Sequence, residues 1–317
     1  MTEIDESSIP VELTAEGARP KDTSWGVFGD RYMIGTLNFL TPQRIQAAAR
    51  LVRTGRRFNL NLPLNRPPRS GDDGIRHSYR HTYISHTEGP GAGQLDEQLD
   101  NFNTQSSTQW DGFAHVRHPR LGFYNGVDPD AVKPGDGSKH SIGAWTETGA
   151  IVGRGVLLDV ERYYKGNGRP YDPASRFVIT RDIVETIAKW EHVELGAGDI
   201  ILIRTGNQRA EARGQRGPEA AGLGPGREMG AFLWAKRIAA VAADTSSFDP
   251  APIEARGPRS MHMQLIPMLG MPIGELFALD ELAADCAQDG IYEFLFISVP
   301  LNLPGGVASP ANALAIK

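Results

Sequence analysis

The chain has 317 residues with a formal net charge of -5, and its acidic and basic residues are interspersed. It carries no basic patch of the kind that binds nucleic acid and no run of about 18 apolar residues that could cross a membrane. We therefore expect neither nucleic acid nor a membrane as a partner. A single cysteine, Cys286, cannot form an internal disulfide, which is typical of a cytoplasmic protein.

The N-terminal stretch is polar, contains Pro10 and Pro20, and lacks the apolar run of a signal peptide. We therefore expect residues 1–22 to form an arm or a disordered tail. No linker rich in proline and serine divides the rest, so residues 23–317 are assigned to one domain.

The body of the chain alternates helical and strand patterns. Thr41 can cap a helix that has Pro42 in its first position, and the pattern at 58–64 is that of a half-buried strand. Such alternation predicts an α/β fold, a mixed sheet with helices packed on it. The other main predicted elements are helices at about 181–190 and 228–240 and strands at 199–204, 241–243 and 294–299.

The segment from 104 to 115 contains four side chains that can bind a metal or carry a proton. They are Gln105, Gln109, Asp111 and His115. In a strand all four would point to one face, because their positions differ by even numbers of residues and strand side chains alternate between faces. In a helix they would pair at a spacing of four residues. The sequence leaves both conformations open, and a polar segment like this one is by itself more often a surface loop.

This segment resembles the signature of the cyclase and kynurenine-formamidase-like metal-dependent hydrolases, His-x-Gly-Thr-His-x-Asp-x-Pro-x-His. Thr108, Asp111 and His115 match the Thr, the Asp and the last His, whereas Gln105 and Gln109 replace the first two His. The likeness extends over nearly the whole chain from about residue 25. It implies the swivelling β/β/α architecture of that family, and a homodimer or homotetramer.

The resemblance also places His262 and Glu275 beside the metal. It implies a ligand set of Asp111, His262 and Glu275, with Gln109 as a neutral oxygen donor. Because an amide oxygen binds first-row metals more weakly than an imidazole, we expect one divalent ion rather than two. Mn²⁺ or Zn²⁺ is expected, with Mg²⁺ as a further candidate.

The predicted function is hydrolysis of an amide or lactone bond in a small cyclic or aryl substrate, through a metal-activated water. His115 would transfer the proton, and Asp111 and Glu275 would complete the catalytic group. Two alternatives stay open: a metal-free lyase, isomerase or cyclase that uses His115 and Asp111, and a non-catalytic relative that binds a metabolite. The residues expected to bind substrate are Gln105, Trp110 and Asp244.

Three further histidines, His77, His81 and His86, have a spacing that resembles a metal site. They lie among arginines and tyrosines and match no ligand of the family signature. We therefore expect them in a substrate loop or on the surface.

Overall fold

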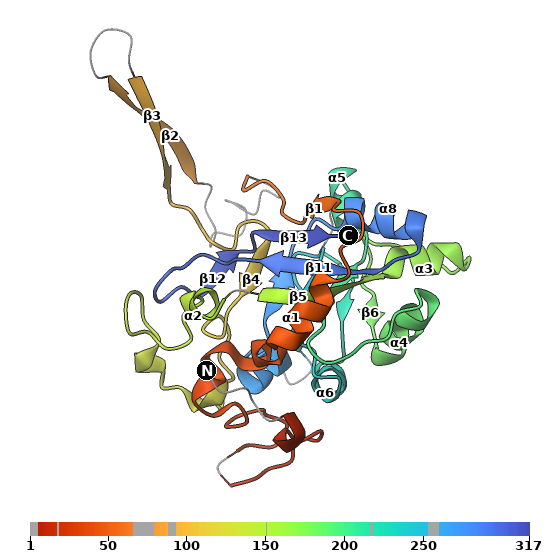
Figure 1. Ribbon diagram of the computed structural model, residues 1–317, viewed down its shortest axis with the longest axis horizontal. Helices are drawn as coiled ribbons and strands as arrows, with labels where there is room; N and C mark the ends of the chain where they lie inside the picture. The colour runs from red at the N-terminus through yellow and green to blue at the C-terminus, as the bar shows by residue number, and fades with distance from the viewer. Residues whose placement is uncertain are drawn as a thin grey trace.

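The computed structural model describes residues 6–17, 19–65, 79–87, 93–149, 151–215, 218–252 and 260–317. Within these residues, nine strands form one mixed sheet in the order β1-β13-β11-β5-β7-β9-β10-β4-β12. Figure 1 shows this sheet in the middle of the body with helices around it. The predicted α/β class is confirmed. The strands are β1 (Arg57–Asn59), β4 (Gln109–Asp111), β5 (Ile151–Asp159), β7 (Ile200–Arg204), β9 (Ala240–Ala243), β10 (Ile273–Glu275), β11 (Glu293–Ser298), β12 (Ala308–Pro310) and β13 (Ala313–Ile316).

Four neighbouring strands, β5, β7, β9 and β10, run parallel at the centre of the sheet. All five residues of β7 are buried, as expected for a parallel strand covered on both faces. β4 runs antiparallel to both β10 and β12. The carboxyl ends of β9 and β10 therefore meet at one edge of the sheet, close to the start of β4.

The helices begin where the sequence provides capping residues. Thr41 Oγ1 accepts a hydrogen bond from the Arg44 backbone at 3.4 Å, with Pro42 in the first position of α1. α1 then packs against β5 and β11. The helices are α1 (Pro42–Ala49), α2 (Gly143–Glu147), α3 (Val160–Gly166), α4 (Arg181–Trp190), α5 (Asn207–Ala212), α6 (Gly226–Ala235), α7 (Met261–Met263), which continues into a π-helical turn (Gln264–Leu269), and α8 (Asp280–Asp289).

One predicted strand is shorter than expected. The pattern at 58–64 predicts seven residues, but β1 ends at Asn59. Beyond it, the Asn61 side chain, not its backbone, accepts from the Ala313 backbone at 2.9 Å, and Pro63 has no N–H to donate. The Leu60 backbone still donates to the Ala313 carbonyl at 3.1 Å, and from Asn61 on side-chain pairing replaces the backbone ladder.

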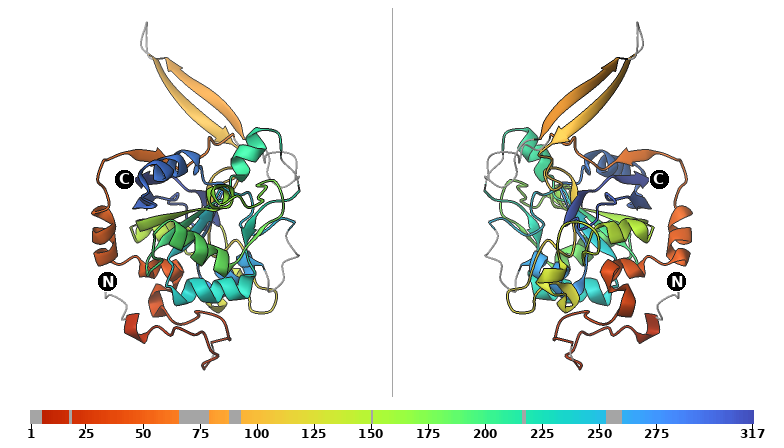
Figure 2. Two further views of the ribbon diagram at one scale, coloured as in Figure 1. Left: turned by 90° about the vertical axis from the view of Figure 1, so that its right-hand side faces the viewer. Right: turned by 90° about the vertical axis from the view of Figure 1, so that its left-hand side faces the viewer.

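A two-stranded hairpin stands away from the body (Figures 1 and 2). It consists of β2 (Arg80–Thr87) and β3 (Gly93–Asp100), paired antiparallel with Tyr83 opposite Glu97. His81 and His86 lie on it and are exposed, as the sequence predicts, while His77 lies outside the described residues. A second small sheet joins β6 (Val178–Ile179) to β8 (Gly222–Leu223).

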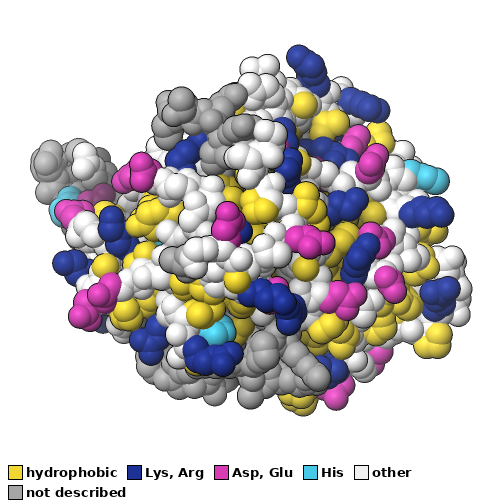
Figure 3. Space-filling model, turned by 90° about the horizontal axis from the view of Figure 1, so that it is seen from below, with side chains coloured by type: hydrophobic (Ala, Val, Ile, Leu, Met, Phe, Trp, Pro, Cys, Tyr) yellow, Lys and Arg dark blue, Asp and Glu magenta, His cyan; other side chains and the backbone are white. Residues whose placement is uncertain are grey.

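The N-terminal segment contacts the body through specific bonds. Glu6 forms ion pairs with Arg44 and Arg237, and the Trp234 indole donates to the Pro10 carbonyl at 2.9 Å. On the face seen in Figure 3, basic and acidic side chains are interspersed. Among the described residues, no helix is both long and apolar enough to span a membrane.

Candidate metal centre

The conformation of β4 decides which side chains of the predicted motif come together. Its register sets Gln109 opposite Glu275 and Asp111 opposite Ile273 of β10. Because strand side chains alternate, Gln109 and Asp111 share one face of the sheet. After the strand, a turn in which the His115 backbone donates to the Gly112 carbonyl at 3.0 Å brings His115 back toward Asp111.

Trp110 points to the opposite face of β4. Its side chain is fully buried and makes edge contacts with Phe277 and Phe296, with ring centroids 5.1 and 6.3 Å away. The indole N–H donates to Ser298 Oγ at 2.8 Å. The structure therefore places Trp110 in the core and does not bring it to the site where a substrate-binding role is predicted.

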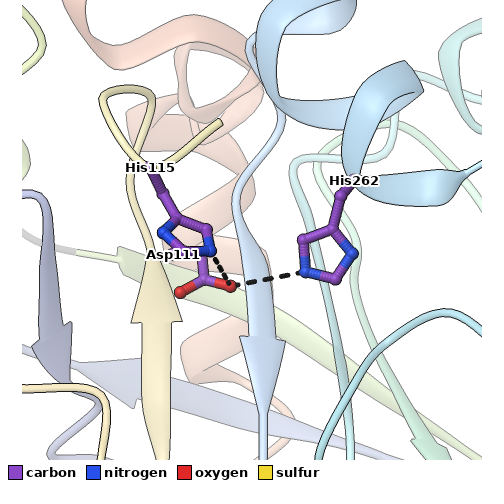
Figure 4. A group of neighbouring side chains, drawn as sticks. All are labelled: Asp111, His115 and His262. Atoms are coloured by element: carbon purple, nitrogen blue, oxygen red, sulfur yellow. Dashed lines mark ion pairs between the residues drawn. The ribbon is translucent and has the colours of Figure 1, made fainter. Parts of the chain in front are cut away.

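Asp111, His115 and His262 form a group whose ligand atoms all lie within 4.8 Å of one another. Asp111 Oδ2 is 3.7 Å from His115 Nε2 and 3.6 Å from His262 Nε2. Figure 4 shows the two imidazoles turned toward this one carboxylate oxygen. A polar group of this kind, on residues from β4, the following turn and α7, could hold a metal ion.

The two oxygens of the Asp111 carboxylate have different surroundings. Oδ1 accepts hydrogen bonds from Gln105 Nε2 at 3.0 Å and Gln109 Nε2 at 3.3 Å. Oδ2 is buried and has no hydrogen-bond partner. Burying a carboxylate oxygen without a hydrogen bond is costly, and a cation or a proton between the two imidazoles would offset this cost.

Glu275 adds a second buried carboxylate. Its Oε1 lies 3.4 Å from His262 Nε2 and accepts from the Phe248 backbone at 3.1 Å. Its Oε2 accepts from Gln109 Nε2 at 3.0 Å. The structure thus brings together all the predicted ligands, Gln109, Asp111, His262 and Glu275, and places His115 beside them.

Asp249 fixes the direction of the His262 ring. Its Oδ2 lies 2.5 Å from His262 Nδ1, and its carboxylate also accepts from the Met261 backbone and from Ser260 Oγ at 2.5 and 3.1 Å. The other ring nitrogen therefore faces Asp111 and Glu275. The family resemblance places the segment that contains Asp249 near the pocket, where it could orient a ligand, but no pattern in the sequence connects Asp249 with His262.

The charges of the group determine how its members titrate. Burial alone would lower the pKa of His262, but the surrounding carboxylates of Asp111, Asp249 and Glu275 raise this pKa well above its usual value. Burial would raise the pKa of Asp111, but the neighbouring His115 and His262 hold it below its usual value. The clustered carboxylates thus favour positive charge in the site, which a bound cation or a proton can provide.

Asp244, which is predicted to bind substrate, has another set of partners. It accepts from the Thr205 backbone at 2.8 Å, from Thr205 Oγ1 at 2.7 Å and from the Gly206 backbone at 2.8 Å. Burial raises its pKa to about 6. Its carboxylate thus holds the turn after β7 and lies outside the Asp111 group.

The donor set fits one divalent cation. The Asp111 carboxylate and the imidazoles of His115 and His262 form a group of ligand types that such ions accept, and Asp111 Oδ2 lies between the two rings without a hydrogen bond. The Glu275 carboxylate lies beside this group, 3.4 Å from His262 Nε2. On the other side of Asp111 the amide N–H groups of Gln105 and Gln109 face the carboxylate. An N–H group cannot act as a metal ligand, so these amide nitrogens add no donor on that side.

Comparisons with known proteins agree with the resemblance seen in the sequence. The family model described as "Putative cyclase" matches residues 41–250. A crystal structure described as a novel cyclase is 31% identical, covers 94% of this chain and 100% of its own, and superposes with a TM-score of 0.78. No curated protein sequence gives a significant match.

More distant solved structures share the fold. Isatin hydrolase A from Labrenzia aggregata, bound to benzyl benzoate, is 19% identical over 82% of this chain and 93% of its own, with a TM-score of 0.54. A protein from Bacillus stearothermophilus described as a "predicted metal-dependent hydrolase" is 17% identical over 83% and 98%, with a TM-score of 0.51. From the family match and the close structural likeness to the novel cyclase, the chain belongs to the cyclase family.

Proposed function

We propose that the protein is a metal-dependent hydrolase that opens an amide or lactone bond in a small cyclic or aryl substrate. The observation that carries this proposal is the buried Oδ2 of Asp111, which accepts no hydrogen bond and lies 3.7 and 3.6 Å from the Nε2 atoms of His115 and His262. The fold, shared with an isatin hydrolase and with a protein described as a metal-dependent hydrolase, supports the same class of reaction.

In this proposal Asp111, His262 and Glu275 hold a single divalent ion, Mn²⁺ or Zn²⁺. Gln109 can add a neutral donor, because its Oε1 is buried without a hydrogen-bond partner. An ion in this position supplies Lewis acidity toward a substrate carbonyl and toward water. The protein's own part is to hold these ligands in place, which Asp249 does for His262 and the Phe248 backbone does for Glu275.

A single ion is favoured over two by the two glutamines. Gln109 Nε2 donates both to Asp111 Oδ1 and to Glu275 Oε2, so its amide joins the two carboxylates. Gln105 Nε2 donates to the same Asp111 oxygen. The carboxylate oxygens on this side are therefore neutralised by hydrogen bonds instead of by a second cation.

His115 is the group placed to exchange a proton with the substrate. Its side chain is 26% exposed, compared with 15% for His262 and 1% for Asp111. Its Nδ1 lies 3.2 Å from Gln105 Nε2, and if Nδ1 accepts from that amide, the ring proton is on Nε2, which faces the site. This tautomer suits His115 to donate a proton to a leaving nitrogen or oxygen.

A second candidate function is metal-free acid–base chemistry by His115 and Asp111. It is favoured by the hydrogen bonds that already satisfy Asp111 Oδ1, and by the raised pKa of His262, which burial opposes but its three carboxylate partners produce. A protonated His262 would then balance the carboxylates in place of a metal. A lyase, isomerase or cyclase reaction would follow in that case.

Metal content distinguishes the two candidates. We would measure metal per chain by mass spectrometry on protein purified without chelator, for the wild type, Asp111→Ala and His262→Ala. His118→Ala is the matched control, because His118 Nδ1 accepts only local backbone hydrogen bonds. The proposal expects a single ion, lost in the first two variants and kept in the control.

The same preparations are then tested for hydrolysis of cyclic amides, aryl amides and lactones. Hydrolysis that stops with chelator and returns with Mn²⁺ or Zn²⁺ supports the proposal. A protein that takes up no metal after incubation with either ion contradicts it. If the protein turns over a substrate equally well with and without chelator, the metal-free alternative is established.

A further inference from the structure

Leu276 directly follows Glu275, the last residue of β10, and has an unusual backbone conformation. Its φ is 59°, in the left-handed region. Within the described part of the chain eight non-glycine residues have a positive φ, and Leu276 is the only one of them with an aliphatic side chain. This conformation brings the Cβ atom of an L residue too close to the following carbonyl oxygen. Such strain persists only where surrounding contacts hold it, and it clusters at functional sites.

Hydrogen bonds hold Leu276 on two sides. Thr108 Oγ1, just before β4, donates to the Leu276 carbonyl at 2.5 Å and accepts from the Leu62 backbone at 2.8 Å. On the side of β9, the Thr245 carbonyl accepts from the Leu276 N–H at 2.9 Å. Leu276 is fully buried and Thr108 is 3% exposed, so water cannot easily take the place of the hydroxyl. The Thr108 hydroxyl is therefore one of the contacts that maintain the strained conformation.

The chain after Leu276 is fixed as well. The Phe277 N–H donates to the Ala243 carbonyl at 3.0 Å, and the Phe277 carbonyl accepts from Gln208 Nε2 at 2.8 Å. A change of φ at Leu276 rotates Glu275 relative to the residues that follow. Because those residues are tied to β9 and α5, relaxation of Leu276 is expected to displace Glu275.

The Glu275 carboxylate depends on its position for its contacts. Its Oε1 accepts from the Phe248 N–H at 3.1 Å and lies 3.4 Å from His262 Nε2. We propose that Thr108 is a positioning residue for this carboxylate: its hydroxyl holds Leu276 in the left-handed conformation, which keeps the carboxylate beside His262. Thr108 thus acts through the backbone and not as a ligand. Its effect on a metal rests on the proposed function, whereas its effect on the carboxylate does not.

The Phe248 amide reports on the position of the carboxylate, because it donates to Glu275 Oε1. We would measure its hydrogen exchange by NMR in protein treated with chelator, relative to the amides of β7, which report global unfolding. Thr108→Val keeps the size of the side chain but removes the hydroxyl, and we expect the Phe248 amide to exchange about ten-fold faster. Thr108→Ser keeps the hydroxyl and should exchange at the wild-type rate. Should circular dichroism show that Thr108→Val does not fold, Thr108→Cys takes its place.

Thr36→Val is the matched control. Thr36 is fully buried, and its Oγ1 donates at 2.7 Å to the carbonyl of Ala239, at the opposite end of β9. This substitution removes a hydroxyl of the same kind away from Leu276, so the exchange of Phe248 relative to β7 should not change. The proposal is overturned if Thr108→Val leaves this exchange unchanged, if Thr108→Ser raises it as much as Thr108→Val does, or if Thr36→Val raises it equally.

A change at position 276 tests the role of strain. Leu276→Gly can adopt the positive φ without a Cβ clash, although it also removes a buried side chain. Comparing the effect of Thr108→Val in the wild type and in Leu276→Gly cancels that second loss. We expect Thr108→Val to speed the Phe248 exchange by a smaller factor in the Leu276→Gly background. Equal factors would show that Thr108 does not act through Leu276, which also overturns the proposal.

The consequence for the metal is measured separately. In titration calorimetry with Mn²⁺ or Zn²⁺, we expect the dissociation constant to rise by about 10- to 100-fold in Thr108→Val and to stay close to the wild-type value in Thr108→Ser. A wild type that binds neither ion would contradict the proposed function, and the exchange measurement would still decide the role of Thr108. A wild type that binds metal with the same affinity as Thr108→Val would overturn the role of Thr108 toward the metal.

Discussion

Asp249 supports His262 from behind: its Oδ2 lies 2.5 Å from Nδ1, and the opposite nitrogen of the ring lies 3.6 Å from Asp111 Oδ2. A carboxylate behind a ligating imidazole fixes the tautomer, aims the ring and makes the ligand nitrogen more basic. Asp249 would therefore influence a metal bound at this site without touching it, by positioning His262.

We predict that Asp249→Asn weakens metal binding by about 10- to 100-fold, the usual loss when such a supporting group is removed. Titration calorimetry with Mn²⁺ or Zn²⁺ measures the dissociation constant. Ser260→Ala is the control, because Ser260 Oγ donates to the same Asp249 oxygen at 3.1 Å but does not contact the ring. Equal affinities in wild type and Asp249→Asn would show that the carboxylate has no influence on the metal.

Restoring imidazoles at the glutamine positions should change the metal stoichiometry. Gln109 Nε2 now donates to Asp111 and Glu275, whereas an imidazole there would present a lone pair between the same carboxylates. We expect Gln105→His combined with Gln109→His to raise metal content from one ion to two per chain. Gln98→His, on the exposed strand β3, controls for adventitious binding by a surface histidine. Unchanged content would mean that the glutamines do not limit the site.

His115 is expected to affect turnover more than metal content. Because it is the most exposed of the three grouped residues, His115→Ala should retain the metal and lower the turnover number by about 10²- to 10⁴-fold, the range for loss of an acid–base group. Parallel metal analysis and kinetics on one preparation separate the two effects, with His118→Ala as control. Loss of the metal in His115→Ala would instead make this histidine a ligand.

Local patterns predicted the elements well where the pattern was strong. The helix expected at 181–190 is α4 with those bounds, and the apolar run at 199–204 is β7, which begins one residue later. The helix expected at 228–240 is α6, which ends at Ala235. There the Arg237 backbone has a positive φ of 56°, which a helix cannot continue through, and its carbonyl accepts from Gly198.

The site could be predicted only in part. Asp111, His262 and Glu275 come from β4, α7 and β10, which are far apart in the sequence, so no local pattern indicates that they meet. Their grouping followed from the family resemblance. Trp110 is a different case, because a strand conformation at 109–111 by itself requires Trp110 to face away from Asp111. The sequence left strand and helix open there, so this consequence could not be drawn.

The core position of Trp110 can be tested independently. Trp110→Phe removes the indole hydrogen bond to Ser298 and part of the contact with Phe277, so we expect the free energy of unfolding to fall by about 1–3 kcal/mol. Metal content and the Michaelis constant should not change. Urea unfolding and kinetics on the same variant check both statements. A raised Michaelis constant at unchanged stability would instead show that Trp110 contributes to substrate binding.

Glu191, just after α4, should make stability depend on pH. It is 2% exposed, its Oε1 accepts from the Asp159 backbone at 2.9 Å, and its Oε2 is buried without a partner. Burial raises its pKa from the ordinary 4.5 to about 9. Between these values the folded protein keeps a proton that the unfolded chain loses. The free energy of unfolding therefore decreases as pH rises through this window.

Glu191→Gln keeps an oxygen that can accept from Asp159 but cannot ionise. We expect this variant to lose the pH dependence and to exceed the wild type in stability at pH 8 much more than at pH 5, by up to a few kcal/mol. Urea unfolding at the two pH values measures the difference. Glu185→Gln is the control on the same helix, because that carboxylate is exposed and pairs with Arg181. If the stability of Glu191→Gln changed with pH in parallel with the wild type, Glu191 would be ionised in the folded protein at neutral pH, and its buried Oε2 would need a partner that comes from solvent.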